Sequence, residues 1–263
     1  MSKFAVNLTT IFTEVPFLER FQKAKQAGFS FVECQFPYQS SIEDLRREIR
    51  DNDLSLVLIN LPAGNWESGE RGLAIFPERR DEFRQSVAKG IEYAKALGVA
   101  KLHCLAGVLD SEADRPRARE TYLENLKFAA SEMASYGLTL LIEPINPYDM
   151  PGYFLSEIEE AANIIEEIGL PNVKIQFDFY HIQRIKGNLS ANFGKYLDQV
   201  GHIQIADVPG RHEPGTGEID YKQVLKDVTD RGFKGYIGLE YSPKASSEES
   251  FKWILEIGTG GLL

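Results

Sequence analysis

The chain has 263 residues, of which 43% are hydrophobic and 26% are charged, and its formal net charge is −10. This length and composition are typical of a globular domain with a large apolar core, not of a disordered or fibrous chain. The negative charge disfavours nucleic acids and anionic membranes as partners, because both would be repelled, whereas a small anionic substrate needs only a locally positive pocket.

Short apolar runs alternate along the chain with longer amphipathic stretches, a pattern typical of βα units around a parallel sheet. We expect eight strands, at residues 4–8, 31–35, 54–60, 101–105, 139–143, 173–178, 202–206 and 236–240. The expected helices cover residues 16–27, 41–52, 79–97, 114–136, 155–169, 185–199, 220–231 and 245–256. No linker divides the chain, so we predict a single (β/α)8 TIM barrel over residues 1–263, with residues 257–263 as a mobile tail.

Two connections are longer than a barrel requires, at residues 61–77 and 206–220. Both follow predicted strands, so we expect them at the carboxyl-terminal mouth, where barrel enzymes place their active sites. Cys34 and Cys104 lie in apolar runs without CxxC spacing, which favours two reduced thiols in the core. The first residues lack the apolar stretch of a signal peptide, and no run approaches the length of a membrane span. We therefore expect a cytoplasmic protein; the sequence leaves assembly into a homo-oligomer open.

Four oxygen-bearing side chains fall at or near the ends of four consecutive predicted strands: Glu143, Asp178, Gln204 and Glu240. Carboxylates gathered in one place repel one another and raise one another's pKa unless a cation is present. An all-oxygen set suits a hard divalent ion such as Mg²⁺ or Mn²⁺ better than Zn²⁺. The alternative, for each acid taken alone, is a solvated or salt-bridged strand end.

Four segments carry a family resemblance: NLPAGNWESGERG (60–72), IEPINPYDMPGYFL (142–155), QFDFYHIQR (176–184) and GHIQIADVPGRHEPGTGEIDY (201–221). They resemble segments of the hydroxypyruvate isomerase family, and the likeness runs from Phe4 to Trp253. The resemblance implies a (β/α)8 barrel with one divalent cation, Mg²⁺ or Mn²⁺, that interconverts hydroxypyruvate and 2-hydroxy-3-oxopropanoate. It implies Glu143, Asp178, Gln204 and Glu240 as metal ligands, with Glu143 and Glu240 as the proton donor and acceptor pair.

The chemistry of such an isomerisation agrees with these residue types. A carbonyl group moves to the neighbouring carbon through an enediolate when one carboxylate removes a proton from carbon and a second returns one. A divalent cation stabilises the negative charge that develops. For binding a sugar-acid substrate we single out His181, and for its carboxylate Arg71, Arg211 and Lys244. A structural or solvated role is the alternative for each of these four residues.

Other functions remain open at this stage. A 2-oxo-tetronate isomerase, acting on four-carbon sugar acids, would use the same metal and glutamates. A barrel that binds a sugar acid without turnover is an alternative from another class, although the presence of both Glu143 and Glu240 argues against it. Ketose epimerases of the wider superfamily often have His where this chain has Gln204. A DNA-repair endonuclease is disfavoured, because this chain has only four His and a net charge of −10.

Overall fold

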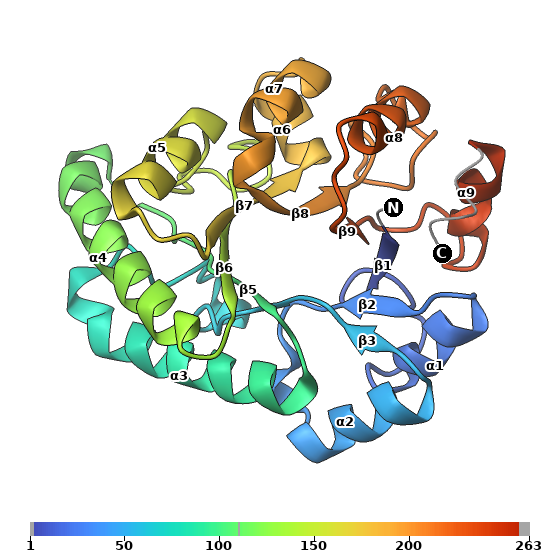
Figure 1. Ribbon diagram of the computed structural model, residues 1–263, viewed down its shortest axis with the longest axis horizontal. Coiled ribbons are helices and arrows are strands. Elements are labelled where there is room, and N and C mark those ends of the chain that lie inside the picture. The colour runs from blue at the N-terminus through green and yellow to red at the C-terminus, as the bar shows by residue number, and fades with distance from the viewer. Residues whose placement is uncertain (1–2, 110, 258–263) are drawn as a thin grey trace.

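The computed structural model describes residues 3–109 and 111–257, and these residues form a ring of short parallel strands surrounded by helices (Figure 1). The strands are β1 (Lys3–Asn7), β2 (Phe31–Glu33), β3 (Ser55–Leu56), β4 (Ile59–Asn60), β5 (Lys101–His103), β6 (Thr139–Ile142), β7 (Val173–Asp178), β8 (Val200–Ile205) and β9 (Tyr236–Leu239). Their order is β3-β2-β1-β9-β8-β7-β6-β5-β4, and every pair is parallel. The predicted (β/α)8 barrel is therefore confirmed.

Strands β3 and β4 are two halves of the single strand predicted at residues 54–60. The backbone continues to bond across the interruption: Val57 N donates to Val32 O at 2.9 Å, and Asn60 N donates to Gln35 O at 2.8 Å. Because β3 pairs with β2 and β4 pairs with β5, this interrupted strand joins the two ends of the sheet and closes the barrel.

The helices are α1 (Glu19–Gln26), α2 (Ile42–Asp51), α3 (Arg80–Leu97), α4 (Arg115–Ala134), α5 (Ile158–Ile168), α6 (Phe179–Ile185), α7 (Leu189–Tyr196), α8 (Tyr221–Asp230) and α9 (Lys252–Glu256). Each of the longer helices buries one apolar stripe, as α5 does with Ile158, Ala161 and Ile165. No helix in the described part of the chain is long and apolar enough to cross a membrane.

The helix predicted at residues 185–199 is observed from Leu189 onward, but the prediction missed the separate helix α6 that precedes it. Helix α6 begins directly after β7, because Asp178 caps it by accepting a hydrogen bond from Tyr180 N at 2.8 Å. Gly187 and Asn188 then adopt positive φ angles of 67° and 52°, which end this helix and start α7. At the far end of the chain, Ile257 packs against the core, and the remainder of the predicted tail, 258–263, lies outside the described residues.

The strands end in a ring of buried polar side chains. Asn7, Glu33, Asn60, His103 and Asp178 are the last residues of their strands, and Glu143 and Glu240 directly follow β6 and β9. The parallel register aligns these positions, since Asn7 pairs with Glu33, Asn60 with His103, and Asp178 with Gln204. The carboxyl ends of parallel strands share one mouth, so the fold gathers these groups there.

Candidate active site

A cavity of about 140 Å³ lies at this mouth of the barrel. Its apolar lining residues are Trp66, Leu105, Ile145 and Met150. Its polar lining residues include Glu143, His181, Arg211 and Glu240. A small cavity lined by apolar residues and a few charged groups is typical of a site for a small polar ligand.

Three carboxyl groups are buried beside one another at this cavity. Burial, with the nearby Asp178 and Glu240, raises the pKa of Glu143 well above its usual range. Burial likewise raises the pKa of Asp178 to about 7 and raises that of Glu240. Among the described residues, Glu143 Oε1 and Asp178 Oδ2 have no hydrogen-bond partner. Buried oxygens of this kind are stabilised by a cation.

One group of residues at the mouth can hold a metal ion. Glu143, Asp178 and His181 each place a potential ligand atom within 4.8 Å of the others. Gln204, another predicted ligand, is buried on β8, but its Oε1 accepts a hydrogen bond from Gln176 Nε2 at 2.7 Å. The structure thus brings the predicted ligands Glu143 and Asp178 together, and the ligand roles of all four residues stay predictions.

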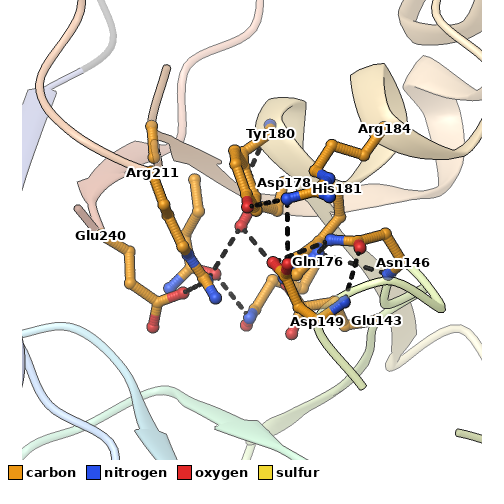
Figure 2. A network of polar contacts seen from close by, with 12 residues as sticks. Glu143, Asn146, Asp149, Gln176, Asp178, Tyr180, His181, Arg184, Arg211 and Glu240 are labelled. Atoms are coloured by element: carbon orange, nitrogen blue, oxygen red, sulfur yellow. Dashed lines mark hydrogen bonds and ion pairs between the residues drawn. The ribbon is translucent and has the colours of Figure 1, made fainter. Parts of the chain in front are cut away.

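Arg211 lies between two of the predicted ligands (Figure 2). Its guanidinium donates a hydrogen bond to Glu240 Oε2 at 2.8 Å and lies 3.6 Å from Asp178 Oδ2. The other oxygen of Glu240 accepts hydrogen bonds from Asn7 Nδ2 at 3.0 Å and from Gln35 Nε2 at 3.1 Å. Glu240 is therefore held on both oxygens, whereas Glu143 keeps one oxygen without such a bond.

The loop after β8 fixes the position of Arg211. The buried carboxylate of Asp207 accepts hydrogen bonds from the backbone N–H groups of Val208, Gly215 and Gly217 at 2.9 Å and of Ile219 at 3.0 Å. Within the turn so formed, Arg211 has a φ of 54°, a left-handed conformation that is unfavourable for a residue with a side chain. The surrounding hydrogen bonds impose this conformation and direct Arg211 to the cavity.

Comparison with known proteins shows to which family this chain belongs. The profile of the xylose isomerase-like TIM barrel family matches residues 21–257. The hydroxypyruvate isomerase of Escherichia coli (strain K12) is 43% identical over 254 residues, which cover 97% of this chain and 98% of that protein. The chain belongs to the hydroxypyruvate isomerase family of xylose isomerase-like TIM barrels.

Other relatives of this family carry different names. The 2-oxo-tetronate isomerase of Cupriavidus necator is also 43% identical over 254 residues, covering 97% of this chain and 98% of that protein. The crystal structure of an AP endonuclease, family 2, from Brucella melitensis has a TM-score of 0.95 and is 41% identical, covering 97% of this chain and 99% of that chain. Membership of the hydroxypyruvate isomerase family therefore does not identify the substrate, which has to be inferred from the residues of the site.

The predicted substrate-binding residues are not all at the cavity. Arg211 and His181 line it, but neither Arg71 nor Lys244 is among its described lining residues. Arg71 stacks on the ring of Trp66, with its guanidinium 3.9 Å from the ring centroid, and donates to the Trp66 carbonyl at 3.0 Å. Lys244 is exposed, and its backbone N–H donates to Glu213 Oε2 at 3.0 Å. The substrate contacts of all four residues stay predictions.

Several polar residues at the mouth were missed by the sequence analysis. Asn7 and Gln35 bind Glu240, Glu33 binds Gln204, and Asn146 contacts His181. For Asn7 and Glu33 a signal existed, because each is a polar residue within a short, mostly apolar predicted strand. For Asn146 the only signal was its place in the loop after the fifth predicted strand.

Proposed function

We propose that this protein interconverts hydroxypyruvate and 2-hydroxy-3-oxopropanoate, with Glu143 and Glu240 exchanging protons with the substrate carbons. One observation carries the proposal: two buried glutamates reach the same small cavity from different strands, beside a guanidinium. The hydroxypyruvate isomerase at 43% identity over nearly the whole chain supports it.

The reaction sets clear demands on these residues. Carbon 3 of hydroxypyruvate must lose a proton, carbon 2 must gain one, and the hydroxyl hydrogen must pass from the oxygen on carbon 3 to that on carbon 2. In the direction from hydroxypyruvate, one ionised glutamate removes the first proton and the second glutamate, protonated, supplies the other. Burial raises the pKa of Glu143 and Glu240, which strengthens the ionised form as a base and favours the protonated form as an acid.

The donor set fits one divalent cation. Glu143 Oε1 and Asp178 Oδ2 are buried oxygens without a hydrogen bond among the described residues, and hard oxygen donors suit Mg²⁺ or Mn²⁺. Glu143, Asp178, Gln204 and Glu240 would hold the ion. When bound, it would stabilise the negative charge that develops on the substrate oxygens.

Arg211 and His181 are proposed to bind the substrate. The side chain of Arg211 is 32% exposed at the cavity, so its guanidinium can accept a carboxylate in place of part of its contact with Glu240. His181, buried on α6, presents its ring to the same space (Figure 2). Trp66, Leu105 and Met150 add apolar surface to the lining of the same cavity.

A second candidate substrate is 2-oxo-tetronate, because the relative of that name is equally similar to this chain. The likeness of residues 60–72 to the hydroxypyruvate isomerase family favours the three-carbon acid. We expect a higher kcat/KM with hydroxypyruvate than with 2-oxo-tetronate under identical conditions. The difference will be modest, since one extra carbon changes binding by about 1–3 kcal/mol.

This comparison of substrates also tests the remaining functions. A strong preference for the four-carbon acid would assign the protein to the second candidate. Binding of both acids without turnover by the metal-loaded protein would make it a sugar-acid-binding barrel. Cleavage of DNA at abasic sites is not proposed, because a net charge of −10 opposes DNA binding.

A reducing compartment such as the cytoplasm is proposed as the location of the protein. The free, buried thiols of Cys34 and Cys104 support this location.

A further inference from the structure

The side-chain amide of Asn146 has a fixed orientation. This fully buried residue lies in the loop after β6, where its Oδ1 accepts hydrogen bonds from the backbone N–H groups of Tyr148 at 3.1 Å and Asp149 at 3.0 Å. Only the oxygen of an amide can accept these bonds, so Nδ2 must point the other way. There it donates to Asp149 Oδ2 at 3.0 Å.

Two donors face the same ring nitrogen of His181. Asn146 Nδ2 lies 2.7 Å from His181 Nδ1, and the backbone N–H of Asn146 donates to the same atom at 3.3 Å. If Nδ1 carried a hydrogen, its N–H would face the two N–H donors of Asn146. Nδ1 must therefore be unprotonated and accept hydrogen bonds from them. A neutral imidazole with a bare Nδ1 carries its hydrogen on Nε2.

The carboxylate of Asp149 is itself held in place by a hydrogen bond. Asp149, which holds Asn146 Nδ2, accepts a hydrogen bond from Arg184 at 3.0 Å, and Arg184 also donates to the Tyr180 hydroxyl at 2.8 Å (Figure 2). His181 Nε2 points toward the carboxylates, 3.6 Å from Asp178 Oδ2. A nitrogen that carries hydrogen has no lone pair for a metal ion, but it can donate to an oxygen.

We propose that Asn146 is a positioning residue that holds His181 in the Nε2–H tautomer, so that His181 donates a hydrogen bond to a substrate oxygen and does not ligate the cation. His181 therefore has a different role from Glu143 and Asp178, although all three residues belong to the group whose atoms lie close enough to hold a metal ion. The part of the inference that concerns the substrate rests on the proposed function; the tautomer does not.

Nuclear magnetic resonance of the full chain labelled with ¹⁵N-histidine tests the tautomer directly. The chain has four His, and the His181 signals are identified by their loss in His181→Gln. We expect a bare Nδ1 and a protonated Nε2, both unchanged when Mg²⁺ is added. A protonated Nδ1 in the wild type, or an Nε2 that loses its hydrogen when Mg²⁺ binds, would overturn the inference.

Asn146→Asp tests the role of the amide, because a carboxylate in place of Nδ2 draws the hydrogen to Nδ1. We expect loss of the pure Nε2–H tautomer and a fall in kcat/KM of about 10–100-fold, with Mg²⁺ affinity within a few-fold of wild type. Asn172→Asp is the matched control: Asn172 donates to the carbonyls of Ala130 at 2.8 Å and Leu138 at 3.1 Å and directly precedes β7, far from the mouth. This control should keep the tautomer and the rate.

Each result has a defined meaning. An unchanged tautomer in Asn146→Asp would refute the positioning role, as would a large loss of Mg²⁺ affinity. If this variant does not fold, Asn146→Ala takes its place, and a second tautomer of His181 is expected beside the first; a single unchanged tautomer would refute the role. A wild-type protein with the expected tautomer but no isomerase activity would remove the proposed function and leave the tautomer assignment standing.

Discussion

Gln204 donates a hydrogen bond from Nε2 to Glu33 Oε1 at 2.7 Å, and both side chains are buried. The second oxygen of Glu33 lies 2.7 Å from His202 Nε2. Because its amide nitrogen donates to a carboxyl group, Gln204 is oriented with its carbonyl oxygen toward Gln176, which lines the cavity. Glu33 therefore fixes the orientation of the one predicted metal ligand that is an amide.

Metal removal is expected to abolish turnover, and Mg²⁺ or Mn²⁺ is expected to restore it. At a concentration 100 times Kd, the ion should stabilise the folded protein by about 2.7 kcal/mol, which raises Tm by roughly 5–10 °C in a domain of this size. The same titration with Glu33→Leu should give a Kd about 10-fold higher, because Gln204 is no longer oriented. Full activity in a sample shown to be free of metal would contradict this prediction.

Glu143→Gln and Glu240→Gln are each expected to lower kcat by about 10²-fold or more, because an amide cannot accept or supply the proton. Metal content is measured beside the rate, since each amide keeps one ligand oxygen. Glu218→Gln is the control, because Glu218 is exposed on the same mouth loop as Arg211.

Turnover of the wild type in D₂O should place deuterium on a product carbon. Product without carbon-bound deuterium at low conversion would exclude exchange through a carboxylate.

Arg211→Met is expected to reduce kcat/KM by about 10–100-fold, mainly through KM, because a charge-assisted hydrogen bond to the substrate carboxylate is lost. Lys244→Met and Arg71→Met are compared with it in the same steady-state assay. Since neither residue lines the cavity, both variants should stay within about three-fold of wild type. A larger effect of Lys244→Met than of Arg211→Met would move the carboxylate-binding role to Lys244.

Lys101 should make the free energy of unfolding depend on pH in the alkaline range. Its ammonium donates to the carbonyl of Gly201 at 2.7 Å, and burial lowers its pKa from 10.5 to about 8. Between these values the unfolded chain binds more protons, so this contribution to stability is full above 10.5 and is lost as the pH falls through about 8. At about 1.4 kcal/mol for each pKa unit, the effect is at most about 3.5 kcal/mol.

Urea unfolding at pH 8 and pH 10 measures this difference in wild type and Lys101→Met. We expect the free energy of unfolding of the wild type to gain more between the two pH values than that of the variant. Comparing the two proteins cancels the other groups that titrate in this range. Equal gains in both would show that Lys101 is not responsible.

The barrel and two of its acids could be predicted from the sequence because both depend on local pattern. Apolar runs define strands, and parallel strands end at one mouth, which brought Glu143 and Asp178 together. The start of α6 was missed because Asp178 was assigned as a strand end and metal ligand, whereas its side chain also caps the helix that follows. His181 is consequently on a helix rather than in a loop.

The choice among Arg71, Arg211 and Lys244 also lay beyond the sequence. All three are cations in loops that follow predicted strands, and residue type alone does not distinguish them. What separates them is the turn held by Asp207, which depends on backbone contacts as far away as Ile219. A hydrogen-bond pattern of that kind leaves no periodicity to detect.

The pairing of β1 with β9 places Asn7 beside Glu240, although the two residues are 233 positions apart in the chain. The site is thus built across the seam of the barrel, where the first strand meets the last. Bringing such distant segments together carries the entropic cost of closing a very long loop. A chain in which β9 is not paired with β1 lacks the hydrogen bond between Asn7 and Glu240, so the proposed activity requires the closed ring.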